Sequence, residues 1–148
     1  MWRTIRILAL ALLPIAGSPG AEGGAIRYYV QLIRGTDSDQ PPQAESKLVG
    51  SRLDGIFRGP LKWKSYWEVC RREVNVTPGQ KARLRLNSER EVEIDLSRPG
   101  KRIVRAFQKG ELVDRTVGPV GEAMTLIGGK RDLGSVWFIV VRRDQPGA

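Results

Sequence analysis

The segment 81–96, KARLRLNSEREVEIDL, decides the fold because it has the pattern of a complete β-hairpin. In its first half, apolar residues at positions 82, 84 and 86 alternate with basic residues. In its second half, apolar residues at positions 92, 94 and 96 alternate mainly with acidic ones. A period of two is typical of a half-buried strand. A turn at Asn87-Ser88-Glu89 joins the halves, so the segment predicts a hairpin with one apolar and one charged face.

The turn also predicts which residues of the hairpin lie opposite one another. On the apolar face, Leu84 should lie opposite Val92 and Ala82 opposite Ile94. On the charged face we expect a ladder of opposite charges, in the pairs Lys81–Asp95, Arg83–Glu93 and Arg85–Glu91. Each such pair contributes roughly 0.2–1 kcal/mol. A slip of one residue would bury the charges, so we expect a firm register.

Turn signals divide the rest of the chain into similar extended stretches. Besides 81–86 and 90–96, we expect strands at 26–34, 63–76, 102–108, 111–117, 123–127 and 136–142. The other breaks after residue 62 are Pro78-Gly79, Pro99-Gly100, Lys109-Gly110, Gly118-Pro119 and Gly128-Gly129. This spacing predicts a mainly β fold, an antiparallel β-sandwich or open barrel of about 7–8 strands with one short N-terminal helix.

The short helix is expected where apolar residues are spaced i, i+4, i+7 and i+8, which places them on one stripe. These residues are Val49, Leu53, Ile56 and Phe57. We expect Ser46 to cap the start of the helix and the Gly-Pro pair at 59–60 to end it. Two glycines within the segment each cost about 1 kcal/mol relative to alanine. The helix therefore depends on docking its apolar stripe against the rest of the domain.

The N-terminal segment has the three-part layout of a secretory signal peptide. Arg3 and Arg6 precede an apolar run at residues 7–15, and small residues follow. A spanning helix needs about 20 residues, so an uncleaved membrane anchor is only the alternative. We expect residues 1–21 to be a signal peptide, with cleavage between 17 and 25, and no transmembrane segment afterwards. The mature protein is then secreted or periplasmic, with a single β-rich domain at 26–143 and a disordered tail at 144–148.

Composition excludes several classes of enzyme. The chain has no histidine and one cysteine, Cys70. Ser-His-Asp and Cys-His catalysis, His-containing or Cys-rich zinc sites and an internal disulfide are therefore impossible. Cys70 is expected to be a buried thiol, with a dimer-forming thiol as the alternative. Asp37 and Asp39 fit a solvated loop as well as a bound cation. We expect no enzymatic activity and no cofactor, with a carboxylate hydrolase as the alternative.

Basic and aromatic residues are interleaved in the segment 62–72. The formal net charge is +9, which favours anionic partners. In an extended strand, Trp63 and Trp67 share one face, while two lysines and a tyrosine lie on the other. The tryptophans are either core anchors or part of a binding surface. The candidate partner-binding residues are Lys62, Lys64, Tyr66, Arg71 and Arg72.

Four segments carry a resemblance to other proteins: LKWKSYWEV at 61–69, NVTPGQKARLRL at 75–86, REVEIDL at 90–96, and MTLIGGKRD at 124–132 with WFIVV at 137–141. Through them the chain resembles a group of uncharacterised secreted bacterial proteins. The last segment is also similar to the Gly-Gly segment and following strand of secretin-type export channels. The resemblance implies an exported β-rich protein, and it implies no catalytic residues.

These observations predict a non-enzymatic envelope domain that acts by protein–protein binding or assembly. The grounds are the signal-peptide pattern, the well-specified β fold and the lack of a recognisable group of catalytic residues in the sequence. The alternative is a binder of an anionic polymer or surface, which would be acidic polysaccharide, lipid headgroups or nucleic acid. That binder would use the basic and aromatic residues of the segment 62–72.

Overall fold

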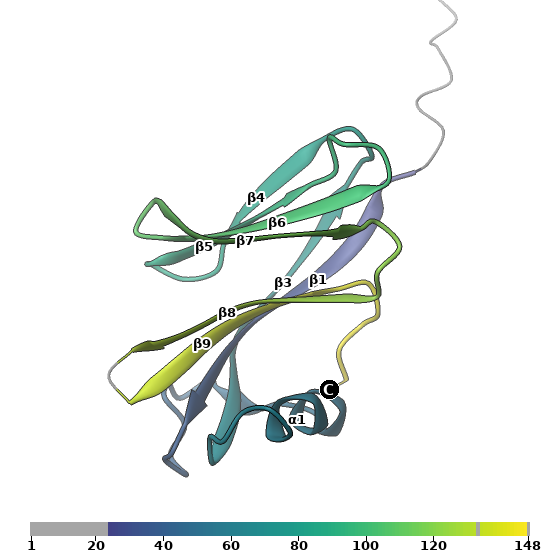
Figure 1. The fold of residues 1–148 in the computed structure, drawn as a ribbon. Helices are drawn as coiled ribbons and strands as arrows, with labels where there is room; N and C mark the ends of the chain where they lie inside the picture. The colour runs from purple at the N-terminus through teal and green to yellow at the C-terminus, as the bar shows by residue number, and fades with distance from the viewer. Residues whose placement is uncertain (1–23, 133, 148) are drawn as a thin grey trace, which may run out of the picture.

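A computed structural model describes residues 24–132 and 134–147, which form two antiparallel sheets and one helix. The strand orders are β2-β3-β1-β9-β8 and β4-β5-β6-β7. The elements are β1 (Ile26–Thr36), β2 (Lys47–Leu48), α1 (Ser51–Arg58), β3 (Ser65–Val76), β4 (Lys81–Arg85), β5 (Arg90–Asp95), β6 (Lys101–Gln108), β7 (Glu111–Pro119), β8 (Met124–Asp132) and β9 (Ser135–Arg142). The four-stranded sheet covers one face of the five-stranded sheet, and α1 lies on the other side (Figure 1).

The predicted sandwich with one short helix is confirmed. All eight expected strands are present, and β2 is an additional strand of two residues in the described part of the chain. The expected signal peptide at residues 1–21 lies outside the described residues. The main core lies between the sheets, where apolar residues of β1, β5, β6 and β9 meet. Its members include Tyr28, Val30, Leu32, Val92, Ile94, Val104 and Val141.

The register predicted for the 81–96 hairpin is confirmed at all five paired positions, from Lys81 opposite Asp95 to Arg85 opposite Glu91. The predicted ion pair of Arg85 with Glu91 is present, whereas Arg83 reaches diagonally to Glu91 instead of to Glu93. Arg83 and Arg85 both reach Glu91, at 2.6 and 3.1 Å. The other two carboxylates are held from β6, because Arg105 lies 2.9 Å from Glu93 and 2.8 Å from Asp95. The sequence did not predict this role of Arg105, since it depends on which strand lies beside β5.

Asp95 makes stability sensitive to acid. Hydrogen bonds from the Arg105 guanidinium and from Ser97 hold the pKa of this buried carboxyl well below its usual value. A carboxyl whose pKa is lowered by folding stabilises the protein above the unfolded-state pKa of about 3.9, and this contribution is lost as the pH falls below it. We expect Asp95→Asn to flatten the fall of unfolding free energy below about pH 4. Urea unfolding measured between neutral and acidic pH would test this. Glu89→Gln in the exposed turn is the control. If the unfolding free energy of Asp95→Asn falls with acid as steeply as that of the unchanged protein, the prediction is contradicted.

A second, smaller core lies between the five-stranded sheet and α1. Phe57 stacks on Tyr66 and Phe138, with ring centroids 4.8 and 5.3 Å away. Leu53 and Phe57 are buried, as the stripe predicted, but Ile56 is 43% exposed. The predicted cap was also wrong, because α1 begins at Ser51 after Gly50. The cause is β2, since pairing of Lys47–Leu48 with β3 keeps the chain extended past Ser46.

Gly128 and Gly129 do not end a strand, contrary to the prediction. They lie inside β8, with φ of +111° and +95°, at a register shift against β9. Positive φ is favourable for glycine both in turns and in β-bulges, so the local sequence does not distinguish the two. The bulge is held from the other sheet, because the Gly128 N–H donates to the Asp114 carboxylate at 3.0 Å.

Arg102 on β6 is a charged side chain inside the sandwich, only 1% exposed. Its guanidinium donates to the Glu122 carbonyl oxygen at 2.8 Å and to the Thr125 hydroxyl at 2.5 Å. It also lies over the Tyr28 ring, 5.4 Å from the centroid. Burying a charge is costly unless it is hydrogen-bonded. These contacts therefore tie β6 to the start of β8 and help to join the two sheets.

Candidate functional site

The five candidate residues of the segment 62–72 do not form one surface. Tyr66 is 1% exposed and belongs to the core beneath α1. Lys62 and Lys64 are exposed but precede β3, and Lys64 is paired with Asp39 at 2.8 Å. Arg71 and Arg72 are exposed further along β3. Thus Tyr66 is not on the surface to stack on a polymer beside the lysines.

Tyr66 is buried because the five-stranded sheet is covered on both faces at this part of β3. Alternation along a strand predicts one buried and one exposed face. Here α1 covers the face that carries Tyr66, and Trp67 on the opposite face is buried as well. Trp63 lies before β3 and packs, partly buried, against the core beneath α1. The core-anchor interpretation of the two tryptophans therefore fits the structure.

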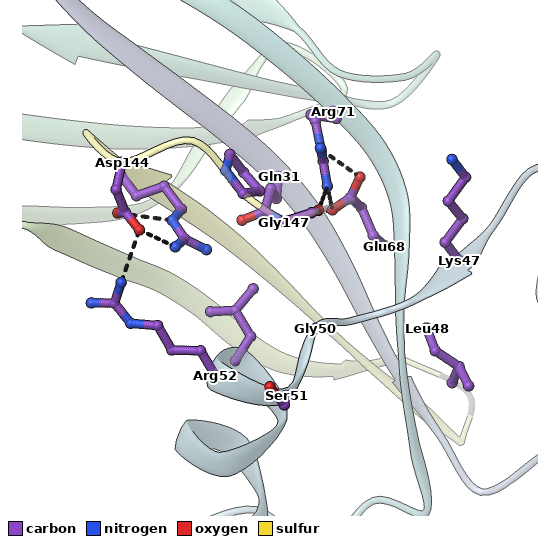
Figure 2. A pocket seen from close by; sticks show the side chains of 13 residues that line it. Gln31, Lys47, Leu48, Gly50, Ser51, Arg52, Glu68, Arg71, Asp144 and Gly147 are labelled. Carbon is purple, nitrogen blue, oxygen red and sulfur yellow. Dashed lines mark hydrogen bonds and ion pairs between the residues drawn. The ribbon is translucent and has the colours of Figure 1, made fainter.

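Arg71 lines a pocket of about 300 Å³, the helix-start pocket (Figure 2). Its wall is built from β1, β2, β3, the first turn of α1, the end of β9 and the segment 144–147. The charged residues in this wall are Lys47, Arg52, Glu68, Arg71, Arg142 and Asp144. Four basic against two acidic side chains leave an excess of two positive charges. The pocket therefore favours an anionic ligand.

One side of the pocket is organised around Glu68. Its carboxylate accepts two hydrogen bonds from the Arg71 guanidinium, at 2.8 and 3.0 Å. It also accepts one from the Gln31 side-chain amide at 2.5 Å. Arg71 in turn donates to the main-chain oxygen of Gly147 at 3.1 Å, as Figure 2 shows. This network orients Arg71 and holds the segment 144–147 against β3.

The other side is organised around Asp144. Arg142 donates to this carboxylate through Nε at 3.0 Å and through a second nitrogen. Arg52 at the start of α1 donates to it at 2.8 Å (Figure 2). The hydrogen bond from Arg142 is the main cause that lowers the pKa of Asp144. The sequence offered no signal for the contact between Arg52 and Asp144, because they lie 92 positions apart.

The first turn of α1 forms part of the pocket wall. Gly50 precedes the helix with φ −63° and ψ 161°, and no side chain caps the helix start. Gly50, Ser51, Arg52 and Leu53 all line the pocket. The first N–H groups of a helix have no partner within the helix and carry a partial positive charge. At the rim, Leu48 on β2 is 64% exposed.

Most charged side chains of the pocket wall are engaged with one another. Of the charged side chains in the wall, both acids and all three arginines are engaged in ion pairs. Within residues 24–132 and 134–147, no cluster of three or more Cys, Asp or Glu residues is placed to hold a metal ion. In the same part of the chain, no helix has the length and apolar character needed to cross a bilayer.

Comparisons of this chain with protein-family models, with curated proteins and with solved structures found no match. The resemblance to secreted bacterial proteins and to the secretin-type segment therefore stays a prediction from the sequence.

Proposed function

We propose that the chain is an exported, non-enzymatic domain of the bacterial envelope that binds a partner protein through the helix-start pocket. The observation that carries the proposal is the wall of this pocket, where four basic side chains surround two carboxylates beside the uncapped start of α1. Export is supported by the N-terminal pattern of Arg3, Arg6 and the apolar run at 7–15.

The surroundings of the pocket favour a protein as the partner. Leu48 adds an exposed apolar side chain to the wall of the pocket. Arginine is among the residue types enriched at protein–protein interfaces and in the residues that dominate their binding energy. Arg71 and Arg52 are already oriented by Glu68 and Asp144, so binding requires little further ordering of these long side chains.

The anionic-polymer hypothesis keeps weaker support. The net charge of +9 and the exposed Lys62 and Arg72 favour it, but Tyr66 in the core removes the aromatic group that would stack on the polymer. Such binding would rest on charge alone and would weaken steeply with salt. Salt-sensitive retention on heparin that falls when Lys62 and Lys64 are both changed to alanine would favour it over the pocket.

Site-directed photocrosslinking in the native host tests the proposal. A photoreactive amino acid in place of Leu48 should give a discrete crosslinked product with one partner protein. The same residue in place of Leu112, a 53% exposed leucine on β7 in the other sheet, should not give this product.

The variant that tests the role of the pocket is Arg52→Gln. It replaces the charged guanidinium with an uncharged amide, which can still donate a hydrogen bond. Arg52 is exposed, so the domain should still fold. We expect the product from position 48 to fall at least severalfold in this variant. Equal products from positions 48 and 112, or a product at 48 that does not respond to Arg52→Gln, would refute binding through the pocket.

A further inference from the structure

The segment 144–147, which we call the tail, lies in the helix-start pocket in the way a bound peptide would. It turns back from the end of β9 and ends beside α1 (Figure 1). Pro146 is buried and forms part of the pocket wall. The main-chain oxygen of Gly147 accepts a hydrogen bond from Arg71 at 3.1 Å (Figure 2). The tail therefore shows which groups of a peptide this site accepts, namely a proline ring and a main-chain oxygen.

The tail leaves much of the site empty. Besides the helix-start pocket of about 300 Å³, a second pocket of about 270 Å³ lies beside the tail and is lined by Tyr29, Arg71, Arg72, Glu73 and Gln145. Arg71 lines both pockets, and tail residues line both as well. A segment as small as Gln-Pro-Gly thus leaves space for larger side chains on both sides of Arg71.

Each pocket also has an exposed cation that the tail does not use. Lys47 lines the helix-start pocket and Arg72 the second pocket. Arg72 donates to the main-chain oxygen of Arg71 at 3.0 Å, and within residues 24–132 and 134–147 neither cation has a carboxylate partner. A peptide with an acidic side chain in each pocket would form two ion pairs that the tail lacks.

Residues 145–147 are held by few contacts, so another peptide can replace them. Asp144 is bound by Arg142, which is only two positions away, and this ion pair does not depend on the residues that follow. Beyond Asp144, the hydrogen bond from Arg71 to Gly147 and the burial of Pro146 hold the tail. A tethered segment competes at a high effective concentration. A partner therefore needs the additional contacts that Lys47 and Arg72 offer.

We propose that an extended, acidic segment of the partner protein, with a proline at its centre, displaces residues 145–147 from this site. Its proline takes the place of Pro146, the main-chain oxygen that follows accepts from Arg71, and its acidic side chains pair with Lys47 and Arg72. The fixed φ of proline lowers the cost of ordering such a segment. This inference rests on the proposed protein-binding function and names the part of the partner that enters.

Fluorescence anisotropy of a labelled peptide tests which groups the site binds. The probe is Glu-Asp-Gln-Pro-Gly-Glu with both ends blocked, which adds an acid on each side of the tail sequence. One comparison peptide has glutamine in place of both glutamates, and the other has alanine in place of the proline. We expect the probe to bind at least severalfold more tightly than either comparison peptide. Equal affinity for the three peptides would overturn the inference.

Pro146→Lys in the full chain tests whether the tail competes with the probe. The buried proline is replaced by a cation in a wall that already has an excess of positive charge, so the tail should leave the site. Gln145→Lys is the matched control, because it adds the same charge at the exposed neighbouring position. The tail lies outside both sheets and α1, so both variants should fold. We expect Pro146→Lys to bind the probe at least severalfold more tightly than the unchanged chain, and Gln145→Lys to show no such gain.

The crosslink from position 48 provides a second readout in the native host. Its product should increase in Pro146→Lys and not in Gln145→Lys. Equal effects of the two variants, or a product that proves to be a second copy of this chain, would overturn the inference. If the product forms but the probe does not bind, the partner enters by another kind of segment, and only this inference falls. If position 48 gives no discrete product, the proposed function falls as well.

Discussion

Phe57→Ala should lower the free energy of unfolding by about 3–5 kcal/mol, the usual cost of removing a buried phenylalanine side chain. The ring is fully buried and stacks on both Tyr66 and Phe138. The helix has eight residues and includes a glycine, so it has little stability of its own. Its docking therefore depends largely on this ring. Guanidinium unfolding followed by tryptophan fluorescence would measure the loss.

Ile56→Ala is the matched control on the same helix. The side chain is 43% exposed, so we expect a loss below about 0.5 kcal/mol. The comparison separates docking from helix propensity, because both substitutions place alanine at adjacent positions. A loss below about 1 kcal/mol for Phe57→Ala, or equal losses for the two variants, would show that α1 is not held by this contact. The undocked variant should also lose binding at the helix-start pocket, which the first turn of α1 lines.

Gly128→Ala should destabilise the domain by about 3 kcal/mol or more, because conformational strain and a steric clash add. The φ of +111° is unfavourable for a residue with a side chain. A Cβ atom there would lie 2.7 Å from the carbonyl oxygen of Trp137 and 3.3 Å from the Cα of Phe138. Both are backbone atoms of β9, a strand paired on both sides, so neither can move without disturbing hydrogen bonds of the sheet.

Gly100→Ala isolates the strain from the clash. Gly100 also has a positive φ, +71°, but its Cβ position is in open space. We expect this control to cost about 1 kcal/mol, since only the left-handed backbone is penalised. Urea unfolding of both variants gives the difference. Equal losses would mean that β8 and β9 separate easily at the bulge, which would contradict the close approach of Gly128 to the β9 backbone.

The hairpin and the class of fold could be predicted from sequence because the forces that specify them are local. Alternation in 81–96 determines which side chains face the core, and the turn at 87–89 determines the register. The apolar stripe likewise located α1, with Leu53 and Phe57 buried as expected. The Gly-Gly pair shows the limit of such reasoning. The sequence predicted a break between strands at this pair, but the pairing of β8 with β9 makes it a bulge inside a strand.

The candidate site was decided by the tertiary structure. Gln31, Arg52 and Asp144 come from β1, α1 and the segment after β9, and no local pattern connects them. The same holds for Tyr66, since alternation cannot reveal that α1 will cover its face of the sheet. Periodicity reports how side chains are distributed about one element. Where elements meet depends on the summed packing of many distant residues, so the charges of the helix-start pocket come together only in the folded chain.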